Sequence, residues 1–361
     1  MEGSNSIKAL QLALILFITQ TGVGIIVLPS ALSKEVGHDG WITVAVTGLG
    51  IIVFALLIMA LLGRYKDKGI YEINKCIYGK YIGTVLNAGV IFYLFAASVV
   101  GTAFFTYYIR ITLLRETPIW ALAPFIALPS FYLVWQGLKN MSRFLFFSIV
   151  SSIIILIFLL FLYKDFKLSF VLPIGEAGIS NILYSTKTCF LAFLGFETTV
   201  FFYPYVTDKQ KALKLSIGAI LMSTVFYLVF VFVSTITFGE NFLNIMLIPF
   251  FSLSRVYNAP ILERVDLYLT AIWFIPLACS VRTYIFAVYD GMQKVFKLKK
   301  TKLTYFIFFV AIIILSSLPK NFNQLLVLMD YISTAGMVLV LFLVLCLVLS
   351  FVRKKGVNNN E

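Results

Sequence analysis

Charged side chains are scarce in this sequence: they make up 12% of its 361 residues, whereas 61% are hydrophobic. Soluble domains contain about 25% charged residues, and a mean hydropathy of +0.98 lies outside their range. The composition therefore excludes an ordinary soluble protein and predicts a polytopic membrane protein. Ten spans of about 20 residues each would use most of the chain, so we expect a single integral membrane domain over residues 1–361.

Histidine and cysteine are also rare, which excludes most catalytic and metal-binding arrangements. The only histidine, His38, lies beside Asp39 in a loop where we expect it to be solvated. The four cysteines are scattered and indicate neither a disulfide framework nor a metal cluster: Cys76, Cys189, Cys279 and Cys346. There is no nucleotide-binding glycine loop or paired-histidine motif, and no nucleophile–base constellation. We therefore expect no enzymatic activity, no cofactor and no bound metal ion.

Apolar segments long enough to cross a bilayer recur along the whole chain. We place them at residues 7–32, 41–63, 81–109, 118–137, 143–163, 184–206, 213–238, 262–290, 303–318 and 328–352. The stretch 239–258 is also apolar, but it contains Pro249 and several polar residues, so we expect a re-entrant or interfacial element there. A short polar tail, 353–361, follows the last segment. The sequence thus predicts an all-α membrane protein with ten transmembrane helices.

Basic residues are concentrated at one face of this arrangement, which predicts its orientation. Most of the 29 lysines and arginines fall in loops at that face, including a group of lysines between residues 294 and 302. By the positive-inside rule this face is cytoplasmic, so we expect both termini, including the tail, in the cytoplasm. The same bias accounts for the net charge of +13, and we expect no nucleic-acid partner.

The first apolar segment contains a polar interruption, ITQTGVGIIVLP, from Ile18 to Pro29. Gly22 and Gly24 each lower helix stability by roughly 1 kcal/mol relative to alanine, and the neighbouring Gln20 and threonines can bond backbone groups that leave the helix. Broken backbone at membrane depth is tolerated where it is buried in protein or lines a cavity. The pattern predicts a discontinuous helix at a binding site. Close helix packing through small residues is the alternative.

A second interruption, AFLGFETTVFFYP from Ala192 to Pro204, lies in the sixth apolar segment. It contains Gly195 and Glu197, and a carboxylate within a span points to a functional site. Interrupted segments at corresponding positions of two halves are typical of transporter midplane sites, so the pair favours a site over plain packing. Glu197 could meet a cationic ligand group or carry a proton, or it could cap a half-helix N-terminus, where the dipole favours negative charge.

Two further segments carry residues that could line the same site. Tyr93, Ala97 and Gly101 are four residues apart and share one helix face, although packing produces the same pattern. In the eighth segment Ser280 and Thr283 could line a cavity together. Hydroxyls in a span often bond the backbone at i−4 instead, so both interpretations stay open.

Several charges in and before the eighth segment need an explanation. Arg282, within the span, should be paired or should snorkel towards an interface. Glu263, Arg264 and Asp266 open the same segment. A helix-dipole cap explains the two acidic residues, and a docking or gating role for the group stays open.

The two interruptions resemble the motifs of a known superfamily. TGVGIIVLP followed by FLGFE is similar to the amino acid–polyamine–organocation superfamily, and this similarity covers nearly the whole chain. The run ERVD after Asn258 and Pro260, together with FETTVFFYPYV, resembles more specifically the B subunit of GerA-type spore germination receptors. The resemblance implies a LeuT-like fold of ten helices in two inverted five-helix repeats, at about 7–163 and 184–352, with helices 1 and 6 broken.

The resemblance also implies a function. Such receptors lie in the inner membrane of the endospore, together with a larger A subunit and a C lipoprotein. They sense a nutrient germinant, often an amino acid or a sugar, which triggers ion release and germination. Carried over by position, the ligand site comprises Gly22, Val23, Gly24, Gly195, Phe196 and Glu197, with Tyr93, Ala97 and Thr283 as additional walls.

A proton- or sodium-coupled amino acid transporter is the alternative function. Proton-coupled relatives in the superfamily carry a lysine in the fifth helix, whereas segment 143–163 has only Arg143 at its edge. A sodium site would need hydroxyls on the eighth helix near the first interruption, and Ser280 and Thr283 keep that alternative open. A purely structural scaffold conflicts with the polar interruptions.

Overall fold

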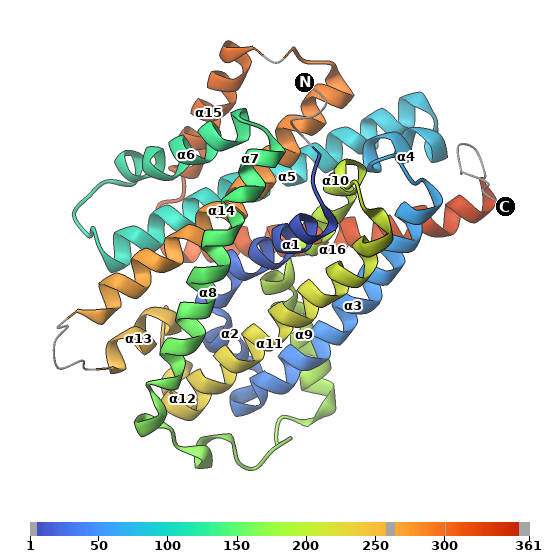
Figure 1. Ribbon diagram of the computed structural model, residues 1–361. Helices are drawn as coiled ribbons and strands as arrows, with labels where there is room; N and C mark the ends of the chain where they lie inside the picture. Colours follow the sequence, from blue (N-terminus) through green and yellow to red (C-terminus); the bar gives the residue numbers. More distant parts are fainter. Residues whose placement is uncertain (1–5, 258–263, 300, 354–361) are drawn as a thin grey trace.

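The computed structural model describes residues 6–257, 264–299 and 301–353, and regular structure in these ranges is helical apart from one isolated bridge (Figure 1). The α-helices are α1 (Ala9–Val23), α2 (Leu28–Val36), α3 (Gly40–Arg64), α4 (Ile70–Tyr78), α5 (Lys80–Thr112), α6 (Ile119–Trp135), α7 (Leu138–Arg143), α8 (Leu145–Leu160), α9 (Gly178–Phe193), α10 (Thr199–Phe202), α11 (Ala212–Phe238), α12 (Glu240–Leu243), α13 (Pro249–Val256), α14 (Val265–Phe296), α15 (Lys302–Ser316) and α16 (Phe322–Val352). The 3-10 helices used below are η2 (Gly24–Ile26), η3 (Gly37–Asp39) and η6 (Phe196–Thr198). Asn258, Pro260 and Glu263 lie outside the described residues.

Among the described residues, seven helical stretches are long and apolar enough to cross a membrane. They are Ala9–Ile26, Leu28–Arg64, Lys80–Thr112, Leu138–Leu160, Lys209–Phe238, Val265–Phe296 and Phe322–Val352. Helices α6 and α15 are apolar but shorter, and the sixth predicted segment is divided between α9 and α10. The prediction of a multi-pass, all-helical membrane protein is therefore confirmed.

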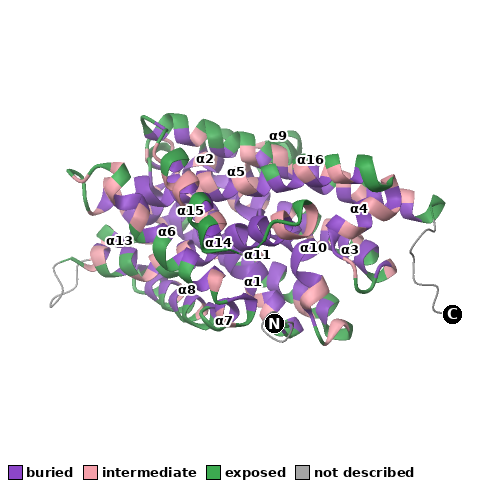
Figure 2. Ribbon diagram, turned by 90° about the horizontal axis from the view of Figure 1, so that it is seen from above, coloured by how far each residue is buried: buried purple, intermediate pink, exposed green. Residues whose placement is uncertain are grey.

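Figure 2 shows exposed residues on the outer faces of the helices and buried residues towards the centre of the molecule. Many of the exposed residues are large and apolar, while many polar residues are buried. Phe92 of α5 and Phe146 of α8 are exposed, as expected where a helix faces lipid. Gln20, Thr198 and Ser280 are buried near the two interruptions. Apolar residues on the outside and polar residues in the interior are typical of a membrane protein, in which polar groups face the inside of the helix bundle.

Both predicted interruptions are breaks in helices. Helix α1 ends at Val23, η2 follows, and α2 begins at Leu28 with Pro29 in its first turn. Helix α9 ends at Phe193, and the chain is extended at Leu194 before η6 begins. In Figure 1 α1 lies in the middle of the molecule, and it contacts α8, α9, α11 and α14. The broken segments therefore occupy the centre of the fold.

The stretch 239–258 forms no spanning helix in its described part, as predicted. It contains the short helices α12 and α13, and α13 contacts both η2 and α14. Phe250 of α13 packs against Trp273 of α14, with ring centroids 5.2 Å apart. This segment thus lies against the break in the first helix.

The expectation that His38 is solvated was wrong. His38 is not solvated: it is 6% exposed, and its ring contacts Glu240, because the turn between α2 and α3 packs against α12. Arg282 is 5% exposed, so it does not snorkel. Its guanidinium instead lies over the Phe144 ring, 5.9 Å from the ring centroid, and 3.5 Å from Cys279 Sγ.

Candidate functional site

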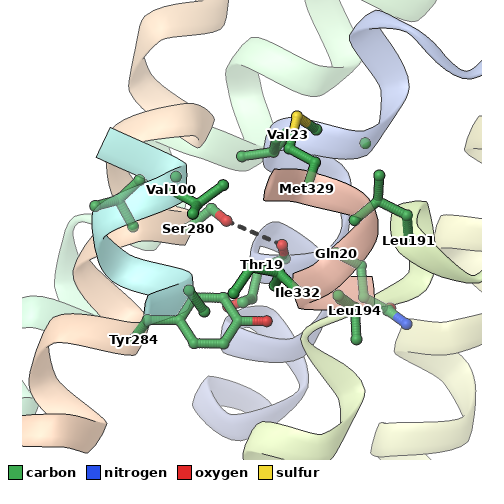
Figure 3. Close-up of a pocket in the computed structure, with 14 residues that line it drawn as sticks. Thr19, Gln20, Val23, Val100, Leu191, Leu194, Ser280, Tyr284, Met329 and Ile332 are labelled. Carbon is green, nitrogen blue, oxygen red and sulfur yellow. Dashed lines mark hydrogen bonds between the residues drawn. The ribbon is translucent and has the colours of Figure 1, made fainter. Parts of the chain in front are cut away.

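A cavity lies where the two breaks meet, enclosed by residues of α1, α5, α9, α14 and α16 (Figure 3). Its volume is about 50 Å³, which is small beside the roughly 300–1,000 Å³ of typical small-molecule sites. Three predicted site residues line it: Val23, Gly24 and Ala97. The breaks therefore surround an internal space, and a ligand of more than a few atoms requires the neighbouring helices to move.

The cavity wall combines polar groups with a larger apolar surface. The polar lining residues are Thr19, Gln20, Ser280 and Tyr284. The apolar ones include Val100, Leu191, Leu194, Met329 and Ile332. Figure 3 shows the Ser280 hydroxyl pointing at the Thr19 carbonyl, to which it donates a hydrogen bond over 3.0 Å. None of the described lining residues is charged, so no side chain of the wall would pair with a ligand that carries a net charge.

Gln20 joins the two breaks through its side chain and its backbone. Its Nε2 donates to the Phe193 carbonyl at the end of α9 over 3.1 Å, and its Oε1 accepts from the Ser223 hydroxyl over 2.7 Å. The Tyr227 hydroxyl lies 2.6 Å from the Gln20 carbonyl and 2.7 Å from that of Ala192. Helix α11 thus supplies donors for carbonyl groups that the broken helices leave without intrahelical partners.

Glu197 is fully buried in η6, and three donors already occupy its carboxylate. Oε1 accepts hydrogen bonds from the hydroxyls of Tyr93 (3.0 Å) and Tyr284 (2.9 Å), and Oε2 accepts one from the Gly195 N–H (2.6 Å). These bonds tie α5 and α14 to the second break. The geometry favours the structural cap among the alternatives for Glu197, because a ligand would have to displace one of these donors.

The three predicted site glycines permit close approach between helices. A Cβ atom at Gly22 would overlap α14, and one at Gly24 would overlap Ala192 of α9. Gly195 has a φ of +124°, and its Cβ would lie 2.9 Å from the Gln20 backbone nitrogen. Gly22 therefore faces helix α14 and not the cavity. Gly24 lines the cavity and also allows the close contact with α9.

The remaining predicted residues lie near the cavity without lining it. Phe196 is buried and meets Phe190 edge to face, with ring centroids 6.1 Å apart. The Thr283 hydroxyl donates to the Cys279 carbonyl over 3.0 Å, which is the i−4 backbone bond that hydroxyls in helices often make. A binding role stays a prediction for Gly22, Val23, Gly24, Tyr93, Ala97, Gly195, Phe196, Glu197 and Thr283.

Sequence reasoning missed the residue of α11 that supports the two breaks and the residues of α16 that line the cavity. Tyr227 supports the breaks from α11, and Met329 and Ile332 form part of the wall from α16. Aliphatic residues in an apolar helix carry no sequence signal that distinguishes a cavity wall from a packing face. Tyr284 could have been predicted to line the cavity, because it directly follows Thr283 in the eighth segment.

Residues 6–325 match the sequence profile of a family described as "Spore germination protein". The chain belongs to this family. The spore germination protein YndE of Bacillus subtilis (strain 168) is 26% identical over 360 residues, covering 98% of both chains. Spore germination protein B2 of the same organism is 24% identical and covers 90% of this chain and 89% of its own length. Spore germination protein GerQB of Bacillus cereus is 25% identical and covers 88% of each chain. The resemblance to spore germination receptors is thus confirmed.

The fold of this spore germination protein family member is shared with a solved structure. The crystal structure of MhsT in complex with L-phenylalanine superimposes with a TM-score of 0.60 and covers 94% of this chain and 88% of that chain. The sequence identity is 15%, so the likeness shows the fold alone. It agrees with the predicted LeuT-like architecture.

Proposed function

We propose that this chain is the germinant-sensing subunit of a spore germination receptor, and that a small molecule such as an amino acid binds between the broken first and sixth helices. The observation that carries the proposal is the cavity at the meeting point of the two breaks, in a chain of the spore germination family. Ligand binding would shift a two-state equilibrium of the transporter-like core, to the extent that one state binds it better. The proposed output is the start of germination, with no enzymatic step.

The proposed architecture has ten transmembrane helices in two inverted repeats, at about 7–163 and 184–352. It would lie in the spore inner membrane with both termini in the cytoplasm, as the distribution of basic residues favours. The proposed partners are a larger A subunit and a C lipoprotein. Much of the chain's apolar surface, such as Phe92 and Phe125, would face lipid.

The cavity wall favours a small ligand with a polar head and an apolar body. Ser280 and Tyr284 provide hydroxyls at one side, whereas Leu194, Met329 and Ile332 form an apolar side. A sugar carries polar groups all round and would leave several of them buried without partners, each at a cost of about 1–3 kcal/mol. An amino acid with a small aliphatic side chain therefore fits better than a sugar.

Coupled amino acid transport is the second candidate. It is supported by the Ser280 hydroxyl, which lies 3.0 Å from the Thr19 carbonyl at the first break, where a carbonyl and a hydroxyl could both serve a cation. Against it, the Thr283 hydroxyl already bonds the Cys279 carbonyl, and α8 contains no lysine. The two candidates differ in whether ligand crosses the membrane.

The deciding experiment is binding and uptake of labelled amino acids and sugars by the full chain in proteoliposomes, alone and with the proposed partners. We expect saturable binding of a small aliphatic amino acid without accumulation. Accumulation that follows a proton or sodium gradient would instead establish a transporter. No saturable binding in either preparation would remove the ligand site from this chain.

Substitution of Ala97 with leucine should weaken binding about tenfold. The added atoms would enter a cavity of about 50 Å³, and overpacking of this kind typically costs about 1–3 kcal/mol, where 1.4 kcal/mol is tenfold in affinity. The measurement is the dissociation constant of the ligand found above, together with the thermal midpoint of the purified protein.

The matched control is Ala96→Leu. Ala96 is the neighbouring residue of α5, but it lines an open groove beside Leu315 and Leu328, so leucine should be accommodated there and affinity retained. Equal affinity in the two variants would place the ligand away from this cavity.

A further inference from the structure

Residues 239–256, here called the strap, form α12 and α13 and lie against the first break. Helix α13 contacts η2, whose first residue, Gly24, lines the cavity. Phe250 of the strap packs between Phe230 of α11 and Trp273 of α14, at centroid distances of 5.8 and 5.2 Å. The strap therefore packs against η2, the segment that joins the two halves of the first broken helix and contributes Gly24 to the cavity wall.

Each end of the strap has a polar attachment. At the α13 end, Arg255 Nε lies 3.5 Å from Asp266 Oδ2 of α14. This arginine side chain is 53% exposed, and exposed ion pairs contribute little. At the α12 end, the Glu240 carbonyl accepts from the Ser33 hydroxyl over 3.1 Å, and the Glu240 carboxylate meets His38. The second attachment is the more buried one and involves the only histidine in the chain.

The His38 ring is placed between two hydrogen-bond acceptors. Its Nδ1 lies 2.9 Å from Glu240 Oε2, and its Nε2 lies 2.8 Å from the Pro173 carbonyl oxygen. Glu240 Oε2 also accepts the backbone N–H of His38 over 3.0 Å. A carbonyl cannot donate a hydrogen bond, and a carboxylate accepts one. Both ring nitrogens therefore have to donate, and only the protonated imidazolium has two donors.

The charged groups that face the ring are carboxylates from three elements. Glu240 comes from α12, Asp39 follows His38 in η3, and Glu176 precedes α9 with an oxygen 3.8 Å from Nε2. Asp39 is itself fixed, because its two oxygens accept the N–H groups of Gly175 and Ala177. Negative charge on all these sides stabilises a positive ring in a buried position.

The pKa of His38, which lies in the turn between α2 and α3, follows from this environment. Burial lowers the pKa of the ring, but the hydrogen bonds to the Pro173 carbonyl and Glu240, and the charges of Asp39 and Glu240, outweigh burial and raise it above its ordinary value of about 6.5. A raised pKa means that the attachment is complete below about pH 6.5 and is lost as the pH rises through the higher value of the folded protein.

The backbone next to His38 leaves room for the contact with Glu240. Gly37 has a φ of +54°, and a Cβ atom there would overlap Glu240 Oε2. Only glycine both adopts this conformation without strain and leaves room for the carboxylate. The turn, the ring and the strap thus fit together as a unit.

We propose that protonated His38 is a pH-sensitive latch, which holds the strap over the first break and releases it when the ring loses its proton. The latch regulates access to the cavity and does not depend on which ligand binds there. Deprotonation leaves Nδ1 or Nε2 without a hydrogen, so that one of the two contacts becomes a repulsion between acceptors. The strap then keeps the Ser33–Glu240 hydrogen bond at the α12 end and the exposed pairing of Arg255 with Asp266 at the α13 end.

The test measures how fast a cysteine on the buried side of the strap reacts with a maleimide. Ser254 is buried on α13, so Ser254→Cys reports opening of the strap. Purified full-length protein is labelled between about pH 6 and pH 9, and labelling is quantified for the peptide that contains residue 254. Each rate is divided by that of the denatured chain at the same pH, which removes the pH dependence of the thiol itself.

We expect the normalised rate to rise about tenfold or more across this range, as loss of a charge-assisted hydrogen bond implies. In His38→Gln the rate should be high and independent of pH. Asp266→Asn removes the other attachment. In this variant the normalised labelling rate should be higher at every pH and should still rise with pH. A rate that stays flat in the parent protein, or a step that survives in His38→Gln, would overturn the proposal.

Glu240→Gln provides a second variant in case His38→Gln fails to fold. It keeps the shape of the side chain but removes the charge that favours the imidazolium, so the step should move to lower pH. If the labelling rate of Glu240→Gln rose at the same pH as in the parent protein, the proposal would also be overturned, because the His38 ring would then titrate independently of Glu240.

Discussion

Replacement of Glu197 with alanine should lower the free energy of unfolding by about 3 kcal/mol or more and reduce the abundance of the protein in membranes. The substitution leaves the hydroxyls of Tyr93 and Tyr284 and the N–H of Gly195 buried without their acceptor. Each such orphaned donor costs about 1–3 kcal/mol, and the missing side chain adds a cavity. Thermal unfolding of the purified chain and quantitative immunoblotting of membranes measure the two losses.

Glu197→Gln separates a structural carboxylate from a ligand-binding one. Glutamine has only one acceptor oxygen, which can accept either from the two tyrosine hydroxyls or from the Gly195 N–H. Its amide group, itself a donor, then faces the donors on the other side. We expect a loss of about 1–2 kcal/mol, with abundance and germinant response falling together. Normal abundance with a lost response would instead assign the carboxylate to ligand binding.

Glu72→Gln is a matched control for this experiment. Glu72 caps the start of α4 by accepting the Gly69 N–H over 2.8 Å, but it is only partly buried. Water can replace the lost bond there, so the change in thermal stability should stay below about 1 kcal/mol.

Gly195→Ala should be the second severe substitution, with a loss of several kcal/mol and little folded protein in the membrane. The φ of +124° is a strained conformation for alanine, and the new Cβ would lie 2.9 Å from backbone atoms of Thr19 and Gln20. Strain of this kind costs about 1–3 kcal/mol, and the overlap can be relieved only by separating the two breaks. Abundance and monodispersity on gel filtration measure the effect.

Gly218→Ala tests whether the loss comes from the position or from the substitution. Gly218 lies within α11, and a Cβ there has no neighbour within 4 Å. Alanine should therefore be neutral or stabilise the helix by up to about 1 kcal/mol. If Gly195→Ala behaved like Gly218→Ala, the described approach of the two breaks would be wrong.

The positions of both breaks could be predicted because their causes are local. Gly22 and Gly24 weaken any helix that contains them, and the φ of +124° at Gly195 favours a residue without a side chain. Seven of the ten predicted spans coincide with helical stretches long and apolar enough to cross a membrane, since a run of about 20 apolar residues is itself the requirement for crossing a bilayer. The family resemblance rested on the same short motifs, and the profile match over residues 6–325 supports it.

The partners of individual polar groups could not be predicted. Glu197 was open to a ligand, a proton or a cap, and only the packing of α5 and α14 shows two tyrosine hydroxyls on its oxygen. His38 was expected in solvent, but it meets residues more than 130 positions away in sequence. Thr283 was equally open between a cavity wall and a backbone bond until the structure placed it against Cys279.

The sequence by itself determined that this protein is a multi-pass helical membrane protein with two broken helices, because span length, hydropathy and helix breaking are properties of contiguous residues. Only the tertiary structure decided which side chains complete the breaks, that Met329 and Ile332 wall the cavity, and that His38 meets the strap. The physical reason is that these contacts depend on how each helix is rotated about its axis and shifted along its neighbours. That geometry is fixed by the packing of all the helices together and by no local pattern.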